Sequence, residues 1–210
     1  MLLKMDISAH DKTALELFKI IINKGPLTLY SANTRSNMPI GTIHRHFKEM
    51  IRTEKIMIYE TSTSGRKKIS YGPTVYGFVY FYRMDEEIRK NLDFYFDTWI
   101  KNEKFVDDLV ESGFDKTRII SEKKSKKVFA KFVYFYAGVE DQLHYLVRNL
   151  DDVHRDVRWF IGGFLLVRKK EYMQAHEELV TEIPGLRKDI SNFLDAMIKS
   201  YGKLEKMNKK

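Results

Sequence analysis

The most constraining feature of the sequence is a change of hydrophobic period between residues 38 and 74. MPIGTIHRHFKEMIR places apolar side chains three and four positions apart, which predicts an amphipathic helix. IMIYET and KISYGPT then alternate and are rich in β-branched residues, and the polar STSGRKK between them predicts a turn. The region therefore combines a helix with a β-hairpin, and three consecutive cations, Arg66, Lys67 and Lys68, are expected at the hairpin tip.

The predicted helix has two chemically different faces. The apolar face consists of Ile43, Phe47, Met50 and Ile51. The opposite face is polar and basic and consists of Gly41, His44, Arg45, Lys48 and Arg52. We expect the apolar face to pack against a core and the polar face to contact a partner.

Two further helices are predicted before this one. DKTALELFKIIINK has apolar residues at helical spacing and is followed by a Gly-Pro stop signal. LTLYSANTRSN predicts a short second helix with Thr28 or Ser31 as its N-cap, ending near Asn37. Pro39 suits the first turn of the third helix, where its missing N–H costs little.

This order of elements, over about residues 8–84, resembles the winged helix-turn-helix superfamily. The resemblance is carried by GPLT after the first helix, by IGTIHRHFKEM as the recognition helix, and by the GRKK wing followed by Tyr71, Thr74 and Gly77. The second helix departs from the usual pattern, because no hydrophobic residue directly precedes its alanine. The resemblance implies a DNA-binding domain over residues 1–84, made of three helices and a β-hairpin wing.

The resemblance also implies roles for individual residues on double-stranded DNA. A recognition helix fits the major groove, about 12 Å wide, where the fork of Arg45 would contact guanine O6 and N7 together. Thr42 and His44 would read neighbouring base edges, and Lys48 and Arg52 would hold phosphates. The wing would contact the minor groove or the flanking backbone. The candidate DNA-binding residues are Gly41, Thr42, His44, Arg45, Lys48, Arg52, Arg66, Lys67 and Lys68.

The charge distribution agrees with an anionic partner. The 210 residues carry a net charge of +8, and residues 1–84 hold 13 Lys and Arg against 6 Asp and Glu. Residues 85–210 are nearly balanced, with 24 against 23. A local excess is expected of a polyanion-binding module, whereas a charge that serves solubility would be spread over both parts. Basic residues on a helix face are also often only solvated, so charge alone does not reject a basic domain without such a partner.

Residues 85–210 predict an all-helical C-terminal domain, which makes the protein mainly α. From Phe129 to Val167, large apolar residues follow in alternating steps of three and four, a heptad-like seam. One long helix or two stacked helices fit this segment, and KVFAKFVYFY within it also fits a strand. A last helix is predicted from Pro184. Before the seam, one helical stripe ends at Gly113 and contains Ile88, Leu92, Tyr95, Trp99, Val106 and Leu109.

The apolar seam must be buried inside a bundle or across a subunit interface. A homodimer through the C-terminal helices would present two recognition helices to half-sites about 34 Å apart. This layout is similar to that of the PadR-like regulators, although the chain has no motif specific to them. An apolar effector pocket and core packing explain the aromatic residues of this domain equally well: Phe94, Tyr95, Phe96, Trp99, Phe132, Tyr134, Tyr136, Trp159, Phe160 and Phe164.

Two alternative functions remain open at this point. Residues 76–82, YGFVYFY, are expected to form a core between the domains, but such aromatics also stack on bases in binders of RNA or single strands. A winged helix can also act as a protein-interaction module of a larger assembly. We favour a double-stranded DNA-binding transcription regulator.

Catalysis and cofactor binding have little support. The absence of cysteine excludes disulfides and thiolate zinc sites and fits a reducing compartment. No P-loop, GxSxG or dinucleotide motif is present. Three clusters have spacings that could hold a metal but form no known array: Glu140 with His144, Asp151 with His154, and His176 with Glu177. We therefore expect no enzyme, no cofactor and no metal.

The sequence also lacks the signals of membrane insertion or export. MLLKMDISAHDK contains no apolar run of signal-peptide length, and WFIGGFLLV, residues 159–167, is the longest apolar block. It is much shorter than the roughly 20 residues that span a bilayer. We expect a cytoplasmic protein without a membrane partner.

Overall fold

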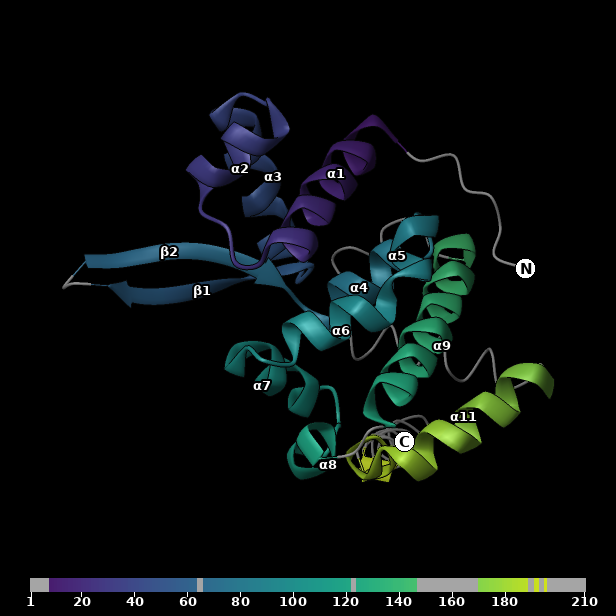
Figure 1. Ribbon diagram of the computed structural model, residues 1–210. Helices are drawn as coiled ribbons and strands as arrows, with labels where there is room; N and C mark the ends of the chain where they lie inside the picture. The colour runs from purple at the N-terminus through teal and green to yellow at the C-terminus, as the bar shows by residue number, and fades with distance from the viewer. Residues whose placement is uncertain are drawn as a thin grey trace, which may run out of the picture.

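The computed structural model describes residues 8–63, 66–121, 124–146, 170–188, 191–192 and 195. It is mainly helical, and a two-stranded antiparallel hairpin follows the first three helices (Figure 1). The predicted mainly α class and the order of three helices before a hairpin are therefore confirmed. The elements are α1 Ala9–Lys24, α2 Leu29–Ser36, α3 Ile40–Arg52, β1 Ile56–Thr63, β2 Arg66–Pro73, α4 Val75–Tyr82, α5 Glu86–Lys90, α6 Leu92–Trp99, α7 Glu103–Glu111, α8 Lys116–Ser121, α9 Ser125–Leu146 and α11 Lys170–Glu182.

The first two helices have side-chain caps that fix where they begin. The hydroxyl of Ser8 accepts a hydrogen bond from the N–H of Asp11 (3.1 Å) at the start of α1. Thr28 accepts one from the N–H of Ser31 (3.1 Å) at the start of α2, so Thr28 is the N-cap. Helix α2 ends at Asn37, which adopts a left-handed conformation with φ 54°. Both predicted helices are confirmed.

Helix α3 has the apolar stripe that its sequence predicts. Ile43, Phe47 and Met50 are buried, and Ile51 is half-buried. Pro39 precedes the helix as its N-cap residue instead of standing in its first turn. Its carbonyl oxygen accepts the first hydrogen bonds of the helix, which is the role of an N-cap residue.

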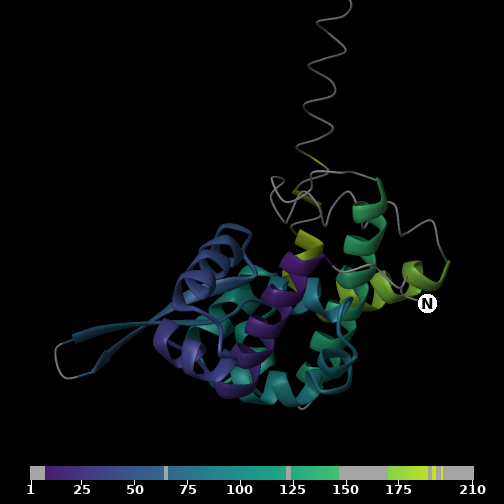
Figure 2. The same cartoon turned by 90° about the horizontal axis from the view of Figure 1, so that it is seen from above.

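The hairpin projects away from the helices (Figures 1 and 2). Its register runs from Ile56 opposite Pro73 to Thr63 opposite Arg66. The three cations lie at the distal end of the hairpin, as expected, but residues 66–68 belong to β2 and pair with β1 instead of forming part of the turn. The turn is shorter than expected because the Thr-Ser-Thr end of β1, rich in β-branched residues, continues the pairing.

Helix α4, which directly follows the hairpin, lies at the centre of the core. Phe78 is fully buried, and its ring contacts Tyr95 of α6, Phe105 of α7 and Phe129 of α9 at centroid distances of 5.8 to 6.1 Å. Helices α4 and α9 lie side by side and make the most extensive helix contact (Figure 1). One hydrophobic core therefore continues from the N-terminal helices into the helical half. The division into domains at residue 84 stays a prediction.

The start of α4 is fixed to the turn between α3 and β1. The hydroxyl of Thr74 donates to the carbonyl of Glu54 (2.5 Å) and accepts from the N–H of Gly77 (2.8 Å). Gly77 lies against the carbonyl oxygen of Lys55, where any Cβ atom would clash. A glycine is therefore required for this close approach of two backbone segments.

The helical half buries the stripe that the sequence predicts. Asn91 and residues 100–102 divide the expected single pattern into α5, α6 and α7. The side chain of Asn102 accepts a hydrogen bond from the N–H of Lys104 (3.1 Å) and caps α7. The stripe residues Ile88, Leu92, Tyr95, Trp99, Val106 and Leu109 are all buried.

Helix α9 settles one of the alternatives left open by the sequence. Residues 127–136 are helical, so the strand alternative for KVFAKFVYFY is wrong. Phe129, Phe132, Tyr136 and Val139 of the predicted seam are buried. Leu143 and Leu146 of the seam lie within α9, but the burial of their side chains is not described. The seam from Leu150 onward lies outside the described residues, so the choice between one long helix and two stays open.

Helix α11 packs across one end of α9 (Figure 1). Lys124 forms an ion pair with Glu182 (2.9 Å), and Lys131 forms one with Glu178. The sequence did not predict α11 as a separate element. The following residues, 184–188, are helical, and this agrees with the predicted helix start at Pro184.

Candidate nucleic-acid interface

The polar face of α3 is open to solvent. Gly41, His44, Arg45 and Lys48 are exposed, and Thr42 is half-buried. A Cβ atom added at Gly41 would meet no other atom within 4 Å, so the backbone of the first turn is accessible as well. The structure therefore brings these predicted residues together on one accessible helix surface.

Arg52 belongs to the same face but is engaged by a carboxylate. Its Nη2 lies 2.7 Å from Oε1 of Glu49, and its Nε lies 3.2 Å from Oε2. This hydrogen-bonded pair lowers the pKa of Glu49. The spacing of three helical positions could have revealed the pair from the sequence. Because Arg45 and Lys48 form no ion pair among the described residues, they are stronger candidates for a polyanion than Arg52.

The orientation of α3 is set by a short, hydrogen-bonded link to α2. The side-chain amide of Asn33 donates to the carbonyl of Met38 (2.6 Å), and the N–H of Met38 donates to Ser36 Oγ (3.2 Å). Ala32 is buried against the core, where a larger side chain would separate the helices. The link therefore presents α3 in one fixed position.

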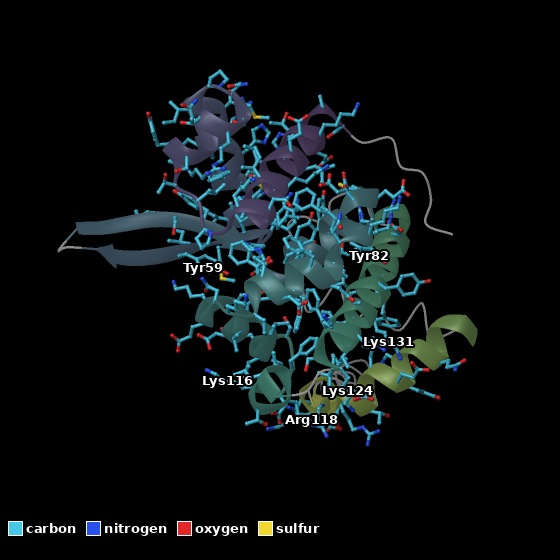
Figure 3. The ribbon with its side chains drawn as sticks, viewed as in Figure 1. Tyr59, Tyr82, Lys116, Arg118, Lys124 and Lys131 are labelled. Atoms are coloured by element: carbon cyan, nitrogen blue, oxygen red, sulfur yellow. The ribbon has the colours of Figure 1, made fainter. Side chains whose placement is uncertain are left out.

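The base of the hairpin is fixed on two sides. Leu27 and Tyr71 exchange two backbone hydrogen bonds (3.0 and 2.8 Å), and the Tyr71 ring packs edge-on against Phe47 of α3 at 4.7 Å. On the other side the Tyr59 ring, at the base of the hairpin in Figure 3, contacts Trp99 of α6 at 5.8 Å. The hairpin and α3 therefore hold a fixed relation to each other.

The structure describes only the backbone of the three predicted hairpin cations. Arg66, Lys67 and Lys68 lie in the distal half of β2, beyond Ile69. The side chains of residues 60–68 lie outside the part of the chain that is described. A contact between these cations and a polyanion stays a prediction.

Sequence reasoning missed several exposed apolar side chains around α3. Ile58 lies opposite Tyr71 and Ile69 lies two residues before it, so all three share one face of the hairpin. This face is turned toward α3, because Tyr71 packs against Phe47. Alternation in the sequence indicated the strands but not which of their apolar side chains would be exposed. The exposed apolar residues of this region are Tyr30, Ile40, Ile58 and Ile69.

The hidden face of α3 carries a buried histidine. His46 is 3% exposed, and its ring stacks on His10 of α1 with centroids 4.5 Å apart. Its Nδ1 has no hydrogen-bond partner among the described residues. Burial lowers the pKa of His46, and His10 and Arg45 lower it further. The neutral imidazole is therefore part of the contact between α1 and α3.

A buried charge cluster lies outside the predicted site, between α4 and α9. The guanidinium of Arg83 is 1% exposed and lies 3.5 Å from Asp141 Oδ1 and 4.0 Å from Glu140 Oε2. Burial raises the pKa of Asp141, Arg83 opposes this shift, and Glu140 adds to it. Two cations lie over the Tyr80 ring, Lys55 Nζ at 3.7 Å and the guanidinium carbon of Arg83 at 5.1 Å from its centroid.

The sequence also suggested a base-stacking surface of aromatic residues and several metal-binding clusters. Residues 76–81 are buried and Tyr82 is half-buried, so the aromatics after the hairpin form core and are not open for stacking on bases. Glu140 faces Arg83, and His176 stacks on Phe135 at 5.7 Å. No group of three His, Asp or Glu residues in the described ranges is arranged to hold a metal ion.

The aromatic residues considered for an effector pocket are divided by exposure. Phe94 and Tyr134 are exposed, whereas Tyr95, Phe96, Trp99, Phe132 and Tyr136 are buried. The ring of Phe96 packs on Phe129 at 5.0 Å, and that of Phe132 packs on Tyr136 at 4.5 Å. Trp159, Phe160 and Phe164, like Asp151 and His154 of the metal clusters, lie outside the described residues, and only the backbone of His144, within α9, is described. An effector stays a prediction.

Comparisons with known protein families, curated proteins and solved structures found no match to this chain. Among the described residues, no helix combines the length and the apolar character that crossing a membrane requires.

Proposed function

We propose that this protein is a sequence-specific double-stranded DNA-binding regulator of transcription, with α3 as its recognition helix and the β1–β2 hairpin as its wing. The observation that carries the proposal is the exposed face of α3, with Arg45 and Lys48, held in a fixed relation to the hairpin by the contact of Phe47 with Tyr71. Helix and wing can then contact one duplex together, without first being ordered.

In this proposal α3 enters the major groove. Arg45 contacts guanine, because its planar fork matches the O6 and N7 acceptors, and Thr42 and His44 read adjacent edges. Lys48 holds a phosphate, and Arg52 does so only if it leaves Glu49. The backbone of Gly41 is open and permits a close approach to the DNA.

The wing and the helical half have separate roles. Residues 66–68 raise the affinity for any duplex through phosphate contacts. The C-terminal helices join two copies into a cytoplasmic homodimer, whose two recognition helices contact half-sites about 34 Å apart. Binding at a promoter then excludes or recruits the transcription machinery.

One observation favours a second candidate function, a protein-interaction module. Ile58 and Ile69 are exposed on the hairpin face turned toward α3, and exposed apolar side chains of this kind are common at protein interfaces. This candidate expects Arg45 to be dispensable for partner binding and expects Ile58→Ser with Ile69→Ser to abolish it.

The experiment that tests the proposal is selection from a random duplex library at about 0.15 M salt. The wild type is compared with Arg45→Ala and with Arg118→Ala, a control on exposed helix α8, far from α3 (Figure 3). We expect the wild type and the control to enrich the same two-fold-symmetric motif and Arg45→Ala to lose it. Failure of the wild type to enrich any motif would contradict the proposal.

A further inference from the structure

Ile40 is the only apolar residue of α3 that is exposed. Its side chain is 52% exposed, whereas those of Ile43, Phe47 and Met50 are at most 2% exposed. The core of the protein therefore does not explain why an isoleucine begins this helix. Single exposed apolar residues are common on protein surfaces, so the place of Ile40 decides whether it has a role.

That place is the first turn of the proposed recognition helix. Ile40 directly follows the rigid N-cap residue Pro39 and shares one helical row with His44 and Lys48, at successive intervals of four residues. The neighbouring Gly41 has no side chain and open space around it. The apolar side chain thus projects from the leading end of a polar, basic surface.

The chemistry of the major groove gives such a side chain one partner. Base edges there offer hydrogen-bond donors and acceptors, and the C5-methyl group of thymine is the apolar feature. Phosphates and sugars would be better contacted by a polar or basic residue. We propose that Ile40 determines specificity by packing against a thymine methyl group in the target duplex, an inference that rests on the proposed DNA-binding function.

The test uses the duplex selected by the full chain. Each dT in turn is replaced by dU, which removes only the methyl group, and affinity is measured by fluorescence anisotropy for the wild type, Ile40→Ala and Ile120→Ala. Ile120 is 67% exposed on α8 and serves as a matched control. We expect one dU position per half-site to weaken wild-type binding about fourfold, the equivalent of ~0.8 kcal/mol for one methyl-sized group.

Ile40→Ala and the control Ile120→Ala distinguish a specific contact of Ile40 from a general effect of removing an exposed isoleucine. Ile40→Ala should bind the thymine duplex about as weakly as the wild type binds a duplex with dU at that position in both half-sites, and it should be insensitive to dU there. Ile120→Ala should behave as the wild type. A selected duplex that tolerates dU at every position, or an Ile40→Ala variant that keeps the full dU effect, overturns this inference alone. Failure to select any duplex overturns it together with the proposed function.

Discussion

The carboxylate of Asp108 in α7 accepts a hydrogen bond from the backbone N–H of Val75, the first residue of α4, at 2.5 Å. Both residues are buried, and they lie 33 positions apart in the chain. A carboxylate at the N-terminus of a helix is also favoured by the helix dipole. The contact joins the segment directly after the hairpin to the helical half of the protein.

Replacing Asp108 by alanine should therefore destabilise the whole fold. The variant leaves the N–H of Val75 buried without this partner, which costs about 1–3 kcal/mol in the free energy of unfolding. Asp107→Ala is the matched control, because its carboxylate is exposed and pairs with Lys116 at the surface. Urea unfolding of both variants measures the difference, and equal midpoints would show that the Asp108 hydrogen bond contributes nothing.

The charge cluster between α4 and α9 leads to a prediction about Arg83. Arg83→Met removes the guanidinium that lies beside the buried carboxylates of Asp141 and Glu140, and we expect a loss of about 3–5 kcal/mol in unfolding free energy at pH 7. The loss should shrink as the pH is lowered, because removing Arg83 raises the pKa of Asp141 further and the folded variant then takes up a proton there. Arg187→Met, at an exposed position, should leave the unfolding midpoint unchanged. A loss of unfolding free energy that does not change with pH would show that the variant is destabilised by lost packing and not by an uncompensated charge.

His46 predicts how stability depends on pH. Its pKa in the folded protein is lowered by burial, so the unfolded chain, with an ordinary value of about 6.5, binds a proton at higher pH. The stability that this neutral imidazole contributes is complete above about pH 6.5 and is lost as the pH falls below it. Urea unfolding from pH 7.5 to 5.5 should show a shallower slope for His46→Gln than for the wild type.

A substitution on the exposed face of the same helix controls for this effect. His44→Gln removes an exposed imidazole from α3, so the two variants differ in whether the lost ring is buried. The slope that remains in all three proteins comes in part from His176, whose pKa is also lowered by burial. Identical slopes for His46→Gln and His44→Gln would contradict the assignment to His46.

The wing prediction concerns the dependence of duplex binding on salt. Replacing Arg66, Lys67 and Lys68 together by alanine should weaken binding to all duplexes alike. It should also lower the slope of log affinity against log salt by about 0.9 for each phosphate that the variant no longer neutralises. Titrations at several salt concentrations measure this slope. An unchanged slope would mean that the hairpin does not bind the DNA backbone.

Local patterns in the sequence were enough to predict the elements around α3. Helical spacing and caps identified α1, α2 and α3, and alternation identified both strands, because these signals arise between near neighbours in the chain. The ion pair of Arg52 with Glu49 could also have been predicted from the sequence, because the two residues are three positions apart in a helix, but it was not predicted.

Features that depend on tertiary structure could not be predicted in the same way. The helix over residues 75–82 is rich in aromatic and β-branched residues, so its sequence predicted a place in the core but no helix. The cluster of Arg83 with Glu140 and Asp141 joins groups nearly sixty residues apart, so no local spacing indicates it. Ile58 and Ile69 are exposed on a hairpin that projects away from the helices (Figure 1). The direction of this projection depends on tertiary contacts, so the local sequence does not indicate it.

The most direct test of DNA recognition is the affinity ratio between the selected duplex and a scrambled duplex of equal length and composition. Anisotropy titrations at matched salt would measure this ratio for the wild type, Arg45→Ala and Arg118→Ala, with the single strand as a further ligand. A sequence-specific DNA-binding protein should bind the selected duplex at least about a thousandfold more tightly than the scrambled duplex. Removing the Arg45 fork should reduce this ratio by the equivalent of about 1–3 kcal/mol per half-site, and Arg118→Ala should leave it unchanged. Equal affinity of the wild type for the selected and scrambled duplexes, or for the selected duplex and the single strand, would contradict sequence-specific recognition of double-stranded DNA.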